Sequence, residues 1–323
     1  MGVDSGLGTF RGVNSAVWQP LKAMCMDFPR MSTPHWFQND PHLAWAFWAW
    51  RFKAYIAVAP HAGYAMLASW GQRRPRGFFS VTSNIDGHWE RTLGPDSDRV
   101  WECHGALTRL QVVDSSSGKI WNACAEEFGR IEQPEWDLRA GEAVEAKLSH
   151  LGTWEEGYVV GTDECSILAA KTGERCSVFG VRREGGGQDL MRILPSSFVP
   201  TGPGGAAARP NVVMHGNDAN VNTAVMDAQR ARFDSWLDTL SPASSRLAIV
   251  EIGAGTALPT IRVLAEQTLR RFACATLIRL NLEQPTAPFG CKDRCILLPL
   301  GALDGLSRIN RRLDEADPVP GAQ

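Results

Sequence analysis

The sequence has no Cys-x-x-Cys pair. Eight cysteines are scattered over 323 residues, and no two of them are separated by only two residues. This spacing excludes Cys-x-x-Cys pairs, whose thiolates hold structural zinc in many proteins. No signal peptide is recognisable ahead of the first motif, so we expect reduced thiols in a cytoplasmic or nuclear protein.

The sequence also lacks a long apolar run and an excess of charge of one sign. No uncharged apolar stretch reaches the roughly 20 residues that a membrane helix needs. The 33 basic and 35 acidic residues leave a net charge of -2, which excludes a general basic surface for nucleic acid. We therefore expect no membrane and no direct nucleic-acid partner. The length allows one large domain and a smaller one.

One short stretch combines an apolar run, a polar loop and a histidine. Residues Phe78 to Val81 are typical of an internal strand of a parallel sheet. Asn84 and Asp86 follow at once, at the carboxyl end where open α/β sheets bind their ligands. His104 precedes a glycine, and an imidazole with a pKa near ~6.5 suits general-base chemistry. The alternative is that the polar loop caps a turn and His104 is a core histidine.

A second apolar run, Leu247 to Ile252, leads into the glycine turn Gly253 to Thr256. We expect a helix to begin near Pro259, so that backbone N–H groups of the turn can face a phosphate or a ribose. A Gly-Ala-Gly turn alone also has many purely structural precedents. The next predicted strand ends at Asn281.

The stretch Leu43 to Val58 is apolar on nearly all sides, with only Arg51 and Lys53 interrupting it. A helix that is apolar all round is buried. We therefore interpret its aromatic residues as core and not as a base-stacking platform.

Several motifs occur in one order along most of the chain, and together they resemble the sirtuins, the Sir2 family of NAD-dependent protein deacylases. The motifs are GVDSGLGTFRG at 2–12, TSNIDG at 82–87, ECHGAL at 102–107, ARPNVVMHGN at 208–217, EIGAGTALPTIR at 251–262 and LIRLN at 277–281. The resemblance implies an α/β fold with a Rossmann-like parallel sheet and a small helical lobe. It also implies that 1–139 and 195–313 form the NAD-binding catalytic domain.

The resemblance further implies the role of each site residue. The cofactor is NAD and the partner is a protein carrying an acylated lysine. The products are deacylated lysine, nicotinamide and an acylated ADP-ribose. The implied catalytic residues are His104, Asn84 and Asp86; the cofactor-binding residues are Phe10, Arg11, Ser83, Ile85, Gly253, Ala254, Gly255, Thr256 and Asn281; the substrate-binding residues are Val213, His215 and Gly216.

The chain departs from the family pattern in three places. It begins inside the first motif, without the family's first strand and glycine turn, and we expect a truncated gene model because losing a central strand would uncover apolar surface. Both zinc-binding cysteine pairs are replaced, by Val112 to Asp114 and by residues including Thr201 and Gly204, so we predict no metal site. His215 stands where the family usually has Phe, which changes the wall of the acyl-lysine tunnel.

Residues 140–194 interrupt the family pattern. Short β-type runs separated by glycines and charges predict a small barrel of about five strands, which resembles a Tudor or Agenet module of the SH3-like class. Trp154, Tyr158 and Phe179 are candidates for an aromatic cage that binds a methylated tail. The alternative is a structural insert that replaces the zinc ribbon. The predicted runs are 144–147, 158–160, 166–170, 177–181 and 190–193, and we expect the tail 314–323 to be disordered.

Two other functions remain open at this point. One is a sirtuin-like NAD hydrolase or ADP-ribosyl transferase, which needs the same residues and a different acceptor. The other is a catalytically degenerate scaffold that binds NAD or ADP-ribose and carries a chromatin-type barrel. Retention of His104, Asn84, Asp86 and Asn281 favours an enzyme.

Overall fold

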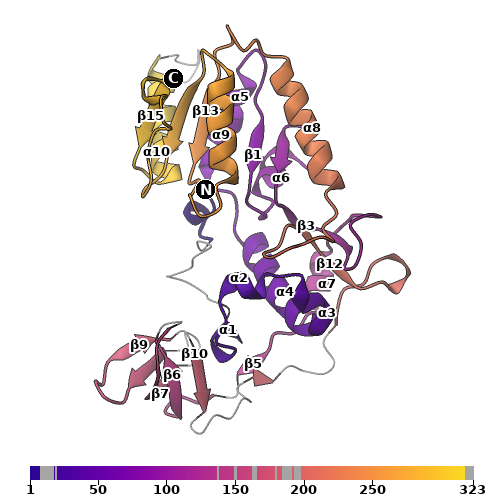
Figure 1. The fold of residues 1–323 in the computed structure, drawn as a ribbon, viewed down its shortest axis with the longest axis vertical. Helices are drawn as coiled ribbons and strands as arrows, with labels where there is room; N and C mark the ends of the chain where they lie inside the picture. Colours follow the sequence, from indigo (N-terminus) through magenta and orange to yellow (C-terminus); the bar gives the residue numbers. More distant parts are fainter. Residues whose placement is uncertain are drawn as a thin grey trace, which may run out of the picture. The chain divides into compact units, whose positions relative to one another are not determined.

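The computed structural model describes residues 1–7, 18, 20–136, 138–148, 151–161, 166–178, 180–183, 191–192 and 198–316 (Figure 1). The chain forms two compact units. The first unit consists of Met1–Leu7, Val58–Ala106 and Thr223–Gln323, and the second consists of Gly8–Ala57 and Leu107–Asn222.

The first unit contains two parallel sheets. In one, β1 (Ser80–Thr82) pairs with β2 (Val100–Glu102). In the other, β14 (Thr276–Leu280) lies between β13 (Ala248–Ile252) and β15 (Cys295–Leu298). These short apolar strands confirm the predicted parallel α/β architecture. The expected single sheet is, however, divided in two: among the described residues, no strand forms hydrogen bonds to a strand of each sheet.

One apolar core nevertheless connects both sheets of the first unit. Helices α8 (Ala224–Asp238) and α9 (Thr260–Arg271) supply Phe233, Leu237 and Leu269 to this core. Phe79, beside β1, and Leu277, on β14, pack into the same cluster. Because burial of such side chains stabilises a fold by about 1.5–3 kcal/mol each, this cluster holds the two sheets together without a shared hydrogen-bond ladder.

A helix at the end of the chain, α10 (Ala302–Ala316), was not predicted from the sequence. It packs against α5 (Ala62–Gln72), and the Trp70 indole N–H donates to Asn310 Oδ1 over 2.8 Å. Its apolar residues recur at helical spacing, which was the available signal. The helix includes 314–316, which the sequence assigned to a tail, and 317–323 lie outside the described residues. The other elements of this unit are η1 (Val3–Ser5), α6 (His88–Leu93) and η3 (Lys292–Arg294).

The second unit contains the predicted aromatic helix, α4 (Pro41–Ala57). Trp45 and Trp48 are almost completely buried, which confirms their interpretation as core. Arg51 is also buried, and its guanidinium lies 4.7 Å from the ring centroids of both Phe28 and Trp48. Cation–π attraction and a 2.8 Å hydrogen bond to the Tyr55 hydroxyl offset the desolvation of this charge. The shorter helices are α1 (Pro20–Ala23), α2 (Phe28–Met31), α3 (His35–Asn39) and α7 (Ala125–Gly129).

Among the described residues, no helix combines the length and the apolar character that crossing a membrane requires.

A three-stranded sheet of the second unit has the order β12 (Ala208–Val212), β3 (Gly105–Val112), β4 (Trp121–Asn122). Buried polar contacts fasten it. Arg209 forms a bidentate pair with Asp218, with Nη1 to Oδ1 at 2.8 Å. Gln111 Oε1 accepts hydrogen bonds from the side chain of Asn211 and the backbone of Asn222, each over 2.9 Å. No group of three or more His, Cys, Asp or Glu suited to a metal occurs in the described part of the chain. The 3-10 turn η2 (Pro203–Gly205) precedes β12.

The interrupting segment contains a five-stranded antiparallel sheet. Its order is β10-β6-β7-β8-β9, so the first strand pairs with both the second and the last. Val144, Val159, Ile167 and Val181 fill its own small core. The strands are β6 (Ala143–Lys147), β7 (Trp154–Gly161), β8 (Ser166–Ala169), β9 (Arg175–Ser177) and β10 (Gly180–Arg183).

Two of the five predicted runs do not each form one strand of this sheet. The run 177–181 is divided between β9 and β10, because Val178 and Val181 both face the core and residues three apart on one strand would face opposite sides. The run 190–193 contains β11 (Met191–Arg192), which pairs with β5 (Glu135–Trp136) and not with the five-stranded sheet. The place of the fifth strand, beside β6, is taken by β10.

Candidate functional site

The candidate site lies at the carboxyl ends of β1 and β2 in the first unit. The two strands run parallel with Thr82 opposite Glu102, and the Cys103 N–H donates to the Thr82 carbonyl over 2.9 Å. Asn84 and His104 each follow their own strand by two residues. Since paired strands lie about 4.8 Å apart, the backbones of these two residues are neighbours at one edge. The fold thus places two of the predicted catalytic residues, which are twenty positions apart in the chain, just beyond the carboxyl ends of two paired strands.

The loop after β1 is held in shape by its own polar side chains. Asn84 Nδ2 donates to Asp86 Oδ2 over 3.3 Å, and the Asn84 N–H donates to Thr82 Oγ1 over 3.0 Å. Asp86 Oδ1 accepts from the backbone N–H of His88 at the start of α6, over 2.9 Å. Gly87 adopts a φ of 68°, which lets the chain turn between the loop and the helix. The capping role considered from the sequence is therefore real for Asp86, and Asn84 faces it.

Two buried rings pack beside this loop, and sequence reasoning assigned neither to the site. His88 is completely buried, with Nδ1 3.8 Å from Asp86 Oδ2. Burial lowers the pKa of His88, although the nearby Asp86 charge opposes this effect. Tyr64 lies edge-on to the His88 ring at 5.4 Å, and burial together with the Asp86 charge raises the pKa of Tyr64, against a hydrogen bond with Asn84. Only the packing of the folded chain shows that Tyr64 lies beside the loop, because it is twenty residues before Asn84 in the sequence.

The first residues of the chain also lie beside this loop. A Cβ built on Gly2 would be 3.8 Å from Asn84 Nδ2. Asp4 Oδ1 accepts from the Leu303 N–H over 3.3 Å, and Ser5 Oγ accepts from the His61 N–H over 3.1 Å. The proximity of Gly2 to Asn84 places the start of the first sequence motif beside the site, and the other two contacts hold this segment against the rest of the first unit. Phe10 and Arg11, the predicted cofactor contacts of that motif, lie outside the described residues.

The glycine turn after β13 is the second part of the site. Gly253 has a φ of 64°, a left-handed conformation that favours glycine. Asn281 Nδ2 donates to the Ala254 carbonyl over 2.9 Å, so the predicted turn and the predicted asparagine do meet. Asn281 Oδ1 also accepts from two backbone N–H groups of its own loop, each over 3.0 Å. Gly255 and Thr256 are exposed at the turn, which leads into α9.

A buried ion pair lies between the two strands that lead to this turn and to Asn281. Glu251 and Arg279 are opposite each other on β13 and β14, and their side chains are completely buried, with Nε 2.7 Å from Oε1. Arg279 Nη2 also lies 3.0 Å from Oε1 of Glu266 on α9. Burial would lower the pKa of Arg279, but the hydrogen bonds that its guanidinium donates to both carboxylates outweigh this effect and raise that pKa. The pair ties the two strand ends and α9 together, and sequence reasoning gave it no role.

The predicted substrate residues Val213, His215 and Gly216 belong to the second unit. His215 donates its backbone N–H to the Ser32 carbonyl over 2.9 Å. Burial lowers the pKa of His215, and the Arg51 charge lowers it further. Val213 is 43% exposed and Gly216 has a φ of 83°, so this loop presents an apolar side chain at the surface.

In the first unit, polar residues follow the carboxyl ends of parallel strands. A glycine turn also leads from the strand β13 into the helix α9. This is the architecture of dinucleotide-binding α/β proteins. Residues 1–235 match the sequence profile of the Sir2 family, and the chain belongs to that family.

Curated relatives carry the name NAD-dependent protein deacylase. The protein of Deinococcus radiodurans is 30% identical over 123 residues, which are 38% of this chain and 47% of the relative. That of Thermococcus kodakarensis is 31% identical over 130 residues, which are 40% of this chain and 44% of the relative. That of Candida albicans is 30% identical over 154 residues, which are 47% of this chain and 45% of the relative. The chain thus matches less than half the length of each of these relatives.

Solved structures agree on the fold. A Sir2 homologue in complex with NAD matches with a TM-score of 0.52 and 14% identity, over 98% of this chain and 86% of that chain. A mutant Sir2 homologue in complex with ADP-ribose matches with a TM-score of 0.52 and 15% identity, over 98% of this chain and 88% of that chain. At these identities the similarity concerns the fold alone.

Proposed function

We propose that this chain is an NAD-dependent protein deacylase of the sirtuin type. It removes the acyl group from a lysine of a protein partner and releases nicotinamide and an acylated ADP-ribose. The observation that carries the proposal is the position of Asn84, Asp86 and His104 at the carboxyl edge of one parallel strand pair. The relatives named as NAD-dependent protein deacylases and the NAD and ADP-ribose complexes of Sir2 homologues support it.

In this proposal the loop after β1 binds and orients. Asn84 and Asp86 hold the ribose and the carboxamide of NAD, with Ser83 and Ile85 beside them. The Asn84–Asp86 hydrogen bond and the cap on α6 fix both side chains before the ligand arrives, so little reorganisation is needed in the transition state. NAD, when bound, supplies the ribose carbon to which the acyl oxygen is transferred.

His104 acts as the general base. In this proposal its imidazole would accept a proton from a ribose hydroxyl, whose oxygen would bond to the acyl carbon. The bond from the acyl carbon to the lysine nitrogen would then break, the lysine amine would leave with the proton, and water would complete the acylated ADP-ribose. The residue stands at the end of β2, next to the strand that carries Asn84, so base and ribose-binding groups share one rigid edge.

The turn after β13 holds the other end of the cofactor. The exposed backbone of Gly255 and Thr256 and the N-terminus of α9 present N–H groups that suit a phosphate or ribose. Asn281 acts through Ala254, whose carbonyl it holds, and so sets the shape of Gly253 to Thr256. In the same proposal Phe10 and Arg11 contact NAD, and Val213, His215 and Gly216 bind the acylated-lysine segment.

We assign 1–139 and 195–313 to the catalytic domain and 140–194 to a Tudor-like insert. A first strand that pairs with both the second and the fifth supports a small closed barrel. The observations favour a structural insert over a reader of methylated tails. The Trp154 ring is already covered by the protein's own cations, with Arg182 at 4.2 Å and Lys147 at 5.6 Å. Tyr158 is 49% exposed, and Phe179 lies outside the described residues.

The deciding experiment measures nicotinamide release with and without an acetyl-lysine peptide and identifies the products by mass spectrometry. We expect release that depends on the peptide and yields acetylated ADP-ribose. His104→Ala should reduce it by at least about a hundredfold, in the range typical of a lost general base. Release without peptide would identify an NAD hydrolase instead. Binding of ADP-ribose without any release would identify a scaffold.

A further inference from the structure

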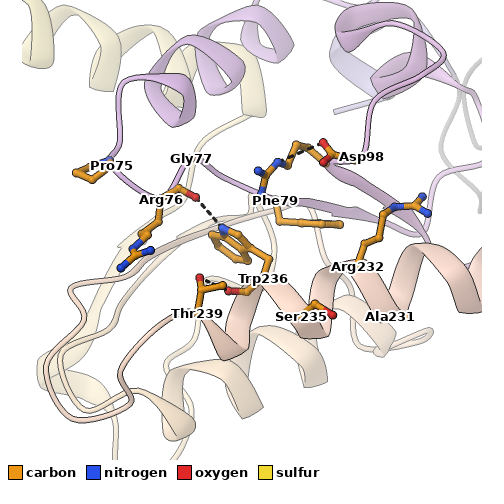
Figure 2. A pocket seen from close by; sticks show the side chains of 11 residues that line it. Pro75, Arg76, Gly77, Phe79, Asp98, Ala231, Arg232, Ser235, Trp236 and Thr239 are labelled. Carbon is orange, nitrogen blue, oxygen red and sulfur yellow. Dashed lines mark hydrogen bonds and ion pairs between the residues drawn. The ribbon is translucent and has the colours of Figure 1, made fainter.

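An open, solvent-exposed cavity of about 650 Å³ lies at the opposite ends of β1 and β2 from the candidate site (Figure 2). Phe79 and Arg99, which line it, immediately precede these two strands, whereas Asn84 and His104 follow them. The far wall comes from the second half of α8. The cavity belongs entirely to the first unit, and the proposed deacylation makes no use of it.

Among the residues that line this cavity, three are arginines and one, Asp98, is a carboxylate. Arg76 and Arg232 are exposed and have no ion pair within the described part of the chain. Arg99 pairs with Asp98 over 3.3 Å, so that acid leaves the other two charges uncompensated. Arg73 and Arg74, on the turn just before, donate to backbone carbonyls, those of Ser69 and Trp70. This gathers positive charge locally in a protein whose net charge is -2.

The floor of the cavity is aromatic and fixed in position. The Trp236 indole N–H donates to the Arg76 carbonyl over 2.8 Å, which links α8 to the arginine-bearing turn. Figure 2 shows Trp236 between Arg76 on one side and Phe79 on the other, with Arg232 farther along the same wall. Phe79 and Trp236 have ring centroids 6.0 Å apart, and both are half-buried. The floor therefore offers apolar area between separated positive charges.

We propose that this cavity is a docking site for an acidic segment of a partner protein. An apolar side chain of that segment covers Phe79 and Trp236, and carboxylates on either side pair with Arg76 and Arg232. Arginine clusters recognise acidic motifs in this way through charge-assisted, directional hydrogen bonds. The site is remote from the deacylation residues, so it selects a partner without taking part in the reaction.

The form of the cavity favours a peptide over the other anionic ligands. Small-molecule sites enclose most of their ligand, whereas most residues that line this cavity are exposed. Nucleic acid is bound by an extended basic surface. Here Arg99 is paired with Asp98, and the arginines without an ion pair among the described residues lie on one turn and at one position of α8.

The test is fluorescence anisotropy of the full chain with a labelled eight-residue peptide that has four acidic residues around one leucine. We expect saturable binding that Arg76→Glu and Arg232→Glu each weaken roughly tenfold, since a reversed charge replaces attraction by repulsion. Arg311→Glu is the matched control. It is also an exposed helical arginine without an ion pair among the described residues, and it should change the affinity by less than about twofold, as an isolated surface charge does.

A second arm changes only the peptide, so protein stability does not enter. Leucine to serine in the peptide should weaken binding about tenfold, because the apolar contact with the aromatic floor is lost. Absence of saturable binding, or equal weakening by Arg311→Glu, would overturn the proposal. A single-stranded oligonucleotide that binds more tightly than the peptide, with the same dependence on Arg232, would also overturn it in favour of a nucleic-acid site.

Discussion

The amide of Asn84 donates to the carboxylate of Asp86 over 3.3 Å, so the two side chains that follow β1 face each other. The same carboxylate accepts the first free N–H of α6 over 2.9 Å. Asp86 is thus both a helix cap and a partner of Asn84. Any change at Asp86 will affect stability and the proposed chemistry together, and the two effects have to be separated by the choice of substitution.

Two substitutions at Asp86 make this separation. Asp86→Asn keeps an oxygen that can cap α6 and removes the negative charge. We expect its unfolding free energy to stay close to that of the unmodified chain, while kcat/KM for peptide-dependent nicotinamide release falls about a hundredfold. Asp86→Ala also loses the cap, which costs about 1 kcal/mol. Urea unfolding and steady-state kinetics measure both quantities. Full activity of Asp86→Asn would remove its charge from the mechanism.

Substitution of Gly253 tests the glycine turn. At a φ of 64°, Gly253→Ala introduces strain of about 1 kcal/mol and shifts the backbone that precedes the exposed N–H groups. We expect weaker binding of ADP-ribose, measured by calorimetric titration.

Gly173→Ala provides the control for strain alone. Gly173 has a φ of 67° and no atom near a built Cβ, and it lies in the insert. This variant should lose similar stability and keep its ADP-ribose affinity. Equal affinity of both variants would show that the turn after β13 does not bind the ligand.

The buried pair of Glu251 and Arg279 should contribute strongly to stability. Glu251→Ala leaves Arg279 with one remaining carboxylate in a completely buried position, and we expect the unfolding free energy to fall by about 3 kcal/mol. Asp304→Asn breaks the exposed pair with Arg308, which has a 2.9 Å separation, and should cost less than about 1 kcal/mol. Urea denaturation compares the two. Similar losses of unfolding free energy would mean that the buried pair stabilises the fold no more than an exposed pair.

The buried imidazole of His88 should make stability depend on pH. Because burial lowers the pKa of His88 from its ordinary value of 6.5, the unfolded chain binds a proton there more readily than the folded chain. The stability from this group is complete above pH 6.5 and is lost as the pH falls through the lower folded pKa.

His88→Leu removes the titrating group and keeps an apolar side chain in the same space. Unfolding free energies measured between pH 7.5 and pH 5 should therefore decline less steeply for this variant than for the unmodified chain. An unchanged slope would assign the whole dependence to other groups, such as His61 and His215, whose pKa values burial also lowers.

Local features of the fold followed well from the sequence. The apolar run at Leu247 predicted β13, the glycines predicted the turn, and Pro259 marked the start of α9. The aromatic run from Leu43 predicted the buried helix α4. These signals are short-range, because hydrophobic spacing, turn residues and caps act within a few positions of the chain.

The sequence by itself determined the local elements, the motif order and the candidate residues Asn84, Asp86, His104 and Asn281. Only the tertiary structure decided that Asn281 holds the Ala254 carbonyl, that Glu251 faces Arg279, and that β10, not the run at 190–193, completes the five-stranded sheet. The physical reason is that strand pairing and burial depend on backbone hydrogen bonds and packing between distant segments. No pattern within either segment encodes its partner.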